Sequence, residues 1–184
     1  MYYIFKYIID NSYLHLLLCQ AFLSCSTTPK LAYNVSNCPD WVVETIETAE
    51  SRIEHRMEQD ILIKLEDAGI PVTCKNFQEF YDDSNCKDLG DHTIACAKNR
   101  EFITINTDRL KYHNGRISII IHEFLHVFGV QEHSEDEKDV MFGLFVPEYP
   151  DRELTENDIA RLKEAIKAYY DSLKFVIKEE KYGN

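Results

Sequence analysis

The segment from Arg116 to Val130 constrains the fold most, because it joins an apolar helical pattern to two histidines one turn apart. Its isoleucine, phenylalanine and leucine side chains recur at three- and four-residue steps and form one broad apolar face. Residues 122–126 read His-Glu-Phe-Leu-His, the pattern HExxH. This spacing places both imidazoles on one face of a helix, within reach of a single metal ion. The sequence therefore predicts a helix that carries a candidate metal site.

Glu123 follows the first histidine of this motif and borders the expected metal, where its carboxylate can accept a proton from bound water. The alternative is a core helix with two half-buried histidines and a surface glutamate. The downstream sequence disfavours that alternative. Gly129 can take the left-handed conformation that ends a helix and turns the chain back, and His133 then follows as a candidate third ligand.

The ordered set of HExxH, Gly129, His133 and Met141 resembles the metzincin metallopeptidases, in which Met141 would be the Met-turn residue. Matrixin-type catalytic domains are the most similar within that clan. The similarity extends to His133-Ser134, to the strand-like residues 102–106 and to residues 154–159, which open the last helix. It covers about residues 40–170 and implies an α+β fold. In that fold, a mixed twisted β-sheet accompanies a long N-terminal helix, an active-site helix and a C-terminal helix.

The resemblance also implies one catalytic Zn²⁺ bound by His122, His126 and a third residue, with hydrolysis of peptide bonds by a zinc-activated water. The family pattern HExxHxxGxxH would place the third ligand at position 132, which is a glutamate here. We favour His133, because imidazole is the commoner ligand and the spacing from His133 to Met141 matches the matrixins. Glu132 is the rival, since a carboxylate also binds zinc and some small secreted metzincins use an acidic residue there.

Residues 1–25 differ from the rest of the chain. Lys6 precedes an apolar run that is too short to span a bilayer, which predicts an export signal. The run also resembles a bacterial lipoprotein signal, in which Cys25 would carry the lipid anchor. Cleavage without lipidation and a buried N-terminal helix are the alternatives. We expect a polar tether over residues 26–37, a catalytic domain over residues 38–184, and a monomer that is secreted or lipid-anchored at the cell envelope.

The chain has six cysteines, of which two lie in the expected signal. The other four predict two disulfides in an exported domain, and the sequence leaves all three pairings open. A zinc-cysteine cluster is disfavoured because the sequence has no CxxC pair. The four are Cys38, Cys74, Cys86 and Cys96.

Periodicity and turn residues predict the remaining elements. We expect a long amphipathic helix from Asp40, as its N-cap, to Gly69, with Val43, Ile46, Ala49, Ile53 and Met57 on its apolar face. A final helix begins at Thr155, with Asp158 completing a capping box. Between these helices we expect a strand over Ile70–Cys74, a polar loop over Asn76–Asp91, and a hairpin of strands Thr93–Ala97 and Phe102–Asn106.

The net charge of −12 argues against a nucleic-acid partner, because no basic stripe is present to replace phosphate counterions. We expect a protein or peptide substrate that binds in extended form along the strand at residues 93–97. The acidic run Glu135, Asp136, Glu137 and Asp139 is interpreted as a solvated loop, with a calcium site as the alternative. The rival function is a non-catalytic exported binding module with a structural zinc, which would need no general base such as Glu123.

Overall fold

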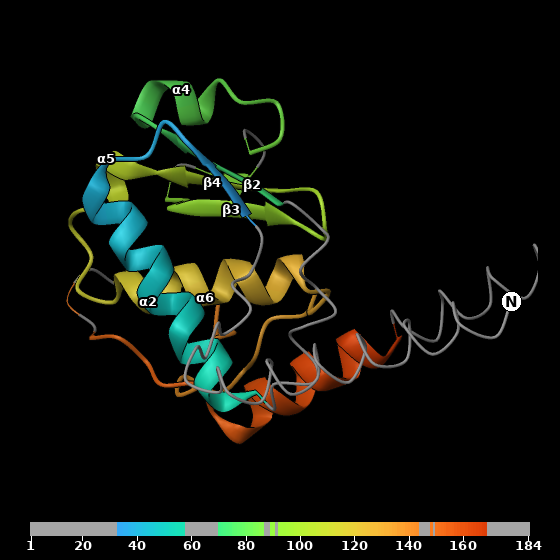
Figure 1. Cartoon of the computed structure of the whole chain (residues 1–184). Coiled ribbons are helices and arrows are strands. Elements are labelled where there is room, and N and C mark those ends of the chain that lie inside the picture. Colours follow the sequence, from blue (N-terminus) through green and yellow to red (C-terminus); the bar gives the residue numbers. More distant parts are fainter. Residues whose placement is uncertain are drawn as a thin grey trace, which may run out of the picture. The chain divides into compact units, whose positions relative to one another are not determined.

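A four-stranded mixed sheet organises the fold, with its strands in the order β1-β2-β4-β3 (Figure 1). β1 (Tyr33–Ser36), β2 (Ile70–Lys75) and β4 (Phe102–Asn106) run parallel to one another, and β3 (Ala95–Lys98) pairs antiparallel with β4. The computed structural model describes residues 33–57, 70–86, 89–90, 92–143, 148 and 150–168. All of them belong to one unit, which spans Leu31–Asn184. The expected α+β class is confirmed.

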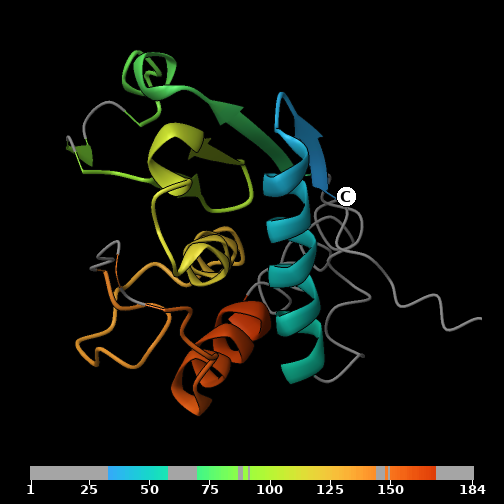
Figure 2. The same cartoon turned by 90° about the vertical axis from the view of Figure 1, so that its left-hand side faces the viewer.

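Helices cover both faces of this sheet (Figures 1 and 2). α2 (Asp40–Arg56) and α6 (Arg116–Val127) lie on one face and pack against each other, and α4 (Phe77–Tyr81) lies on the opposite face. α5 (Thr107–Leu110) is a single turn that follows β4 directly. Helical residues 156–168 lie on the side of α6 that faces away from the sheet. α6 is therefore enclosed between the sheet and the last helix.

α2 forms the predicted amphipathic helix but begins and packs differently in detail. Pro39 is the N-cap in extended conformation, and its carbonyl oxygen accepts the first helical N–H, so Asp40 is a first-turn residue. The buried stripe runs through Val42, whereas Val43 is only half-buried. α2 ends at Arg56. The predicted continuation over residues 58–69 lies outside the described residues.

The polar loop predicted over Asn76–Asp91 contains α4, so that prediction is wrong for its first part. Asn76 and Glu79 form a capping box, in which the Asn76 side chain accepts the Glu79 N–H at 2.9 Å and the Glu79 carboxylate accepts the Asn76 N–H at 3.2 Å. Phe80 is the buried apolar residue of this helix, and its side chain is fully buried. The predicted polar tether likewise includes β1, so its last residues belong to the sheet.

Two disulfides are present, as the cysteine content predicts. Cys38, in the link between β1 and α2, pairs with Cys74 of β2, and Cys86 pairs with Cys96 of β3. Cys86, Cys96 and Phe80 form a small buried cluster beside the main core. Two disulfides are compatible with an extracellular protein. Residues 1–25, including Cys25, lie outside the described residues.

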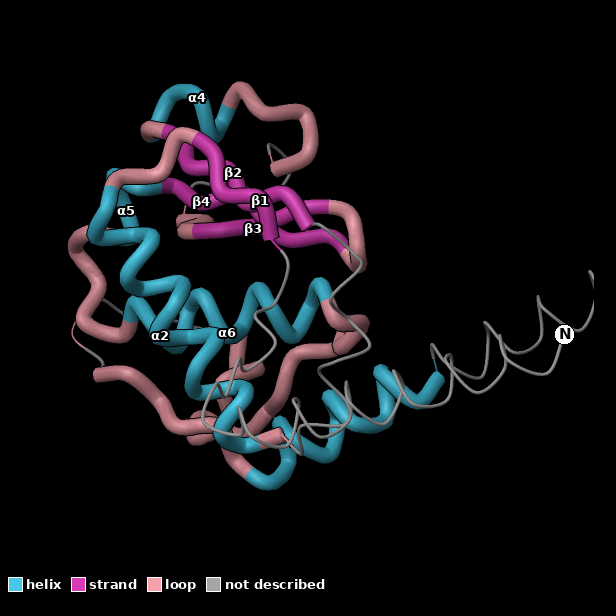
Figure 3. The backbone as a smooth tube through the Cα atoms, viewed as in Figure 1, coloured by secondary structure: helices cyan, strands magenta, loops and turns pink. Residues whose placement is uncertain are grey.

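The predicted hairpin is confirmed, although β3 starts at Ala95 and not at Thr93. α6 ends at Val127, before the predicted Val130, because Gly129 has a φ of +106° and cannot continue the helix. Where the structure describes it, the chain from there to the last helix is loop and turn (Figure 3). The last helix has the predicted cap, since Asp158 accepts the Thr155 N–H and the Thr155 hydroxyl accepts the Asp158 N–H. No helix among the described residues is long and apolar enough to cross a membrane.

Candidate metal centre

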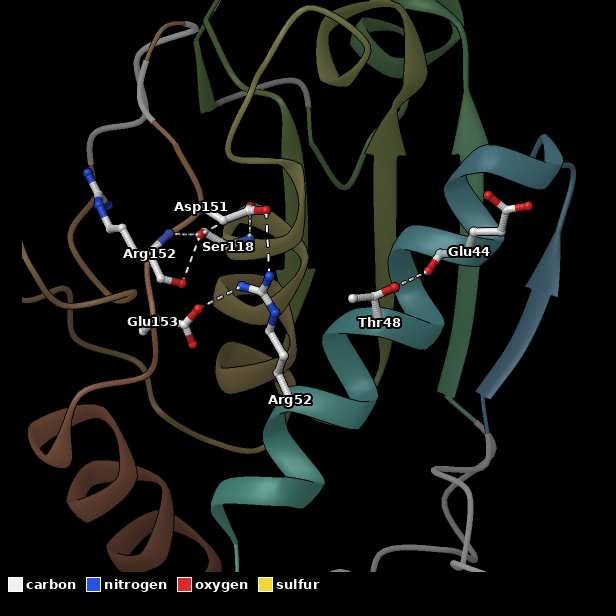
Figure 4. Close-up of polar contacts among 7 residues, drawn as sticks. All are labelled: Glu44, Thr48, Arg52, Ser118, Asp151, Arg152 and Glu153. Atoms are coloured by element: carbon white, nitrogen blue, oxygen red, sulfur yellow. Dashed lines mark hydrogen bonds and ion pairs between the residues drawn. The ribbon is translucent and has the colours of Figure 1, made fainter.

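The position of α6 is fixed at its N-terminus by a distant carboxylate. Its N-cap, Gly115, has no side chain to accept the first N–H groups, and Asp151 supplies that acceptor by bonding the Ser118 N–H at 3.0 Å. The buried Ser118 hydroxyl also bonds the main chain of Arg152. Arg52 of α2 reaches both Asp151 and Glu153 (Figure 4). Residues 151–153 thus join α2 to the N-terminal end of α6.

Three imidazoles converge at the C-terminal half of α6. The Nε2 atom of His122 lies 3.1 Å from that of His126 and 3.2 Å from that of His133, and the remaining side of the triangle is 3.3 Å. They form the one group of three or more histidine, cysteine or acidic residues, within the described ranges, that can hold a metal ion. His122 and His126 come from one face of α6, and His133 comes from the following turn.

Main-chain carbonyls set the tautomers of the two helical histidines. The Nδ1 of His122 lies 2.9 Å from the Val140 carbonyl oxygen, and the Nδ1 of His126 lies 2.7 Å from that of Val130. Because a carbonyl oxygen only accepts, each Nδ1 carries the proton and each Nε2 presents a lone pair. Two lone pairs that face each other at 3.1 Å repel unless a cation lies between them. The arrangement therefore fits a metal ion.

The spacing of the three nitrogens is compatible with a tetrahedral metal ion such as zinc. Zinc–nitrogen bonds of about 2.0–2.1 Å at tetrahedral angles put the ligand nitrogens about 3.3–3.4 Å apart. The observed separations of 3.1–3.3 Å are close to this value. Burial lowers the pKa of His122 to about 3 and also lowers the pKa of His126. Both imidazoles are consequently neutral at pH 7, the state in which histidine binds a metal.

The turn after α6 returns His133, and not Glu132, to this group. Gly129 reverses the chain through its left-handed conformation, and the Ser134 N–H then bonds the Met141 carbonyl oxygen at 2.8 Å. Glu132 is exposed and does not belong to the three-residue group. Met141 is fully buried in the returning loop, beside Val140, whose carbonyl holds His122. The structure thus brings together His133 and the two helical histidines.

Glu123 lies next to His122 on α6 and lines the same pocket as the three histidines. Its side chain is buried, and it has no hydrogen bond within the part of the chain that the structure describes. In the metal-free protein this burial raises the pKa of Glu123 to about 8. A carboxyl group with a perturbed pKa beside a metal site is a candidate acid or base.

The pocket has a volume of about 410 Å³ and lies between α6 and the edge strand β3. One wall carries the three imidazoles and Glu123, and the other follows the chain from His92 to Ala97. Leu89, His92 and Gly143 also line it, and sequence reasoning did not single them out as site residues. In the sequence, His92 only precedes a strand and Gly143 only follows Met141 by two residues. Leu89 is distinguished only in the structure, where its large apolar side chain is exposed.

The acidic run after His133 is only partly solvated, so the predicted solvated loop is wrong for Asp139. That side chain is buried and accepts hydrogen bonds at 2.6 Å from both the Ser134 and the Thr155 hydroxyls. Glu135, Asp136 and Glu137 are exposed. Among the described residues, the run forms no group that can hold a cation, so the calcium alternative has no support. Asp139 instead links the turn of His133 to the last helix.

No family model matches the chain, and no curated protein matches it. The class of site is therefore defined by its own geometry. It is a three-histidine group that can hold a metal ion, beside a buried carboxyl group in an open pocket.

Proposed function

We propose that the chain is a zinc-dependent endopeptidase in which His122, His126 and His133 hold the metal. The observation that carries the proposal is the convergence of three Nε2 atoms within 3.3 Å of one another, in a pocket that Glu123 also lines. Three ligands on a zinc ion leave one coordination position for water, as a hydrolytic site requires. A structural zinc site would have four protein ligands and no need for a carboxyl group at its side.

Bound zinc would polarise the substrate carbonyl, lower the pKa of a water molecule and, as a nearby positive charge, favour the ionised form of Glu123. The Glu123 carboxylate accepts a proton from the water that attacks the peptide carbonyl. It then returns this proton to the leaving amine nitrogen. The Val140 and Val130 carbonyls keep the helical imidazoles in the tautomer that binds metal through Nε2.

The substrate in this proposal is an extended peptide that adds to the free edge of β3. Among the described residues β3 pairs only with β4, and Ile94 accepts the Asn106 N–H at 2.8 Å. Because hydrogen-bonded pairs alternate along an antiparallel ladder, the main-chain groups of Ala95 and Ala97 point away from β4. They are available to a peptide strand in the pocket. Both side chains are small and pack against the core, which lets β3 lie close to α6.

Two further features support placing the site among the metzincins, with matrixin-type domains the most similar. Gly129 has the left-handed conformation that turns the chain toward a third ligand, and Met141 is buried in a turn that contacts the ligand loop. Export through residues 1–25 and secretion belong to the same proposal, and the two disulfides are consistent with them.

The test is hydrolysis of an unfolded protein such as casein by the full chain freed of residues 1–25. We expect cleavage that a chelator stops and that zinc restores. Zinc binding at the three histidines with no hydrolysis of casein or of a peptide library would contradict the peptidase proposal. That outcome would favour the binding module with a structural zinc.

A further inference from the structure

The third imidazole is held differently from the other two. His122 and His126 each have a carbonyl on Nδ1, whereas His133 has no hydrogen bond on Nδ1 within the described ranges. His133 is also exposed, while His122 is buried. Metal-binding imidazoles generally need a second contact to fix the ring, so another group must orient His133.

Gly143 lies beside the ring. A Cβ atom built on Gly143 would lie 3.3 Å from Cγ, 3.4 Å from Nδ1 and 3.5 Å from Cδ2 of His133. These three atoms form the Cγ end of the imidazole, so a side chain at position 143 would press against that end of the ring. Main-chain contacts hold the residues next to His133 and Gly143 together. The Ser134 N–H bonds the Met141 carbonyl oxygen, and Ser134 forms an isolated β-bridge with Phe142.

We infer that Gly143 is a positioning residue for the third metal ligand, and that it is a glycine because any side chain would displace the His133 ring. The inference rests on the proposed metal site. The backbone of Gly143 lies outside the left-handed region, so alanine is allowed there by conformation and only the contact with His133 opposes it. A methyl group at 3.3 Å forces a shift of a few tenths of an ångström, which moves Nε2 away from the other two nitrogens.

The experiment compares zinc affinity, by competition with a chromophoric chelator, for the wild type and Gly143→Ala. We expect a loss of about tenfold, at the lower end of what removal of a supporting contact costs. The absorption of the Co²⁺-loaded protein should change as well, because it reports ligand geometry. Gly90→Ala is the control: Gly90 has a φ of +91° and no atom within 4 Å of a built Cβ, so it should lose stability and keep its zinc affinity.

A double-mutant cycle separates positioning from general damage. If Gly143 acts through the ring, Gly143→Ala should not lower the residual zinc affinity of His133→Ala. An equal loss in both backgrounds, or a wild-type affinity and Co²⁺ spectrum for Gly143→Ala, would overturn the inference and leave the metal site intact. A wild-type protein that binds no zinc through its histidines would instead overturn the proposed function.

Discussion

The carboxylate of Asp158 accepts the main-chain N–H of Val140 at 2.9 Å, and the carbonyl oxygen of Val140 in turn bonds His122 at 2.9 Å. One residue of the Met141 turn thus connects the last helix to the metal centre. Asp158 also accepts the Met141 and Thr155 N–H groups. Its carboxylate satisfies several main-chain donors at a fully buried position.

Replacing Asp158 with alanine should therefore weaken both folding and metal binding. Val140 and Met141 would keep buried N–H groups without acceptors, at about 1–3 kcal/mol each. We expect zinc affinity to fall about tenfold or more as His122 loses its support. Urea unfolding of the metal-free protein and zinc competition measure the two effects. The control is Glu156→Ala, which removes an exposed ion pair with Arg56 and should change stability by less than about 1 kcal/mol. Equal stability of the two variants would contradict this role for Asp158.

Glu123→Ala should keep about one zinc ion per chain and lose peptide hydrolysis by at least about a hundredfold. The reason is that Glu123 transfers protons in the proposed mechanism and is not a ligand. Metal analysis and peptide cleavage test the two halves of this prediction. Glu135→Ala, at an exposed site beside the same loop, serves as the control and should retain activity. A Glu123→Ala protein with more than about a hundredth of wild-type activity would show that another group is the base.

His133→Ala should lose most of its zinc affinity, whereas Glu132→Ala should keep its metal and most of its activity. The structure places His133 Nε2 3.2 Å from that of His122, while Glu132 is exposed. Isothermal titration with zinc distinguishes the two variants. The opposite pattern would assign the third ligand to Glu132. Equal partial losses would show that both residues support the metal.

Glu123 should lower the stability of the metal-free protein progressively between about pH 5 and 8, and below about pH 6.5 the buried His122 and His126, whose pKa values are lowered, contribute with the opposite sign. Burial raises the pKa of this carboxyl from 4.5 to about 8. In that window the folded state holds a proton that the unfolded state has released, so stability decreases with rising pH by up to about 1.4 kcal/mol per unit. Glu123→Gln removes the effect. Urea unfolding with chelator present should show that the free energy of unfolding of the variant rises relative to that of the wild type as pH increases. Parallel plots of the two free energies against pH would contradict the prediction.

Asp151→Ala should destabilise the protein by about 1–2 kcal/mol, the usual worth of a helix N-terminal acceptor. Asp151→Asn should recover much of this loss, since an amide oxygen can still accept the Ser118 N–H. Thermal unfolding gives the comparison. Glu153→Ala is the control, because this side chain is exposed and contributes only a surface ion pair to Arg52. A loss for Glu153→Ala as large as that for Asp151→Ala would assign the effect to the ion pairs and not to the cap.

The sequence predicts the elements whose signals are local. The apolar period of α6, the capping box at Thr155 and the two strands around Lys98–Glu101 are confirmed because neighbouring residues carry the information. α4 also had a local signal, the pair Asn76 and Glu79, which its acidic surroundings masked.

The contacts that support the candidate site had no such signal, although Asp158 was predicted as a capping residue of the last helix. Asp139, Asp158 and Gly143 act through contacts with residues distant in sequence, and an aspartate in an acidic run looks the same whether buried or solvated. The disulfide pairing likewise depends on which strands become neighbours, so cysteine spacing left it open. Motif spacing did identify the histidines that converge, because in this chain two of them lie on one helix and the third lies on the turn that follows it.

If the proposed peptidase function holds, the Cys86–Cys96 disulfide bears on how the protein withstands cleavage by other copies of itself. It closes a covalent ring that contains Leu89 and His92, both of which line the pocket. Another copy that cut the chain inside this ring would leave the two new ends attached through sulfur. β3 would stay paired with β4, and the pocket wall would keep its strand. Under the proposed function, a cut between Cys86 and Cys96 would therefore nick the chain without separating its two parts.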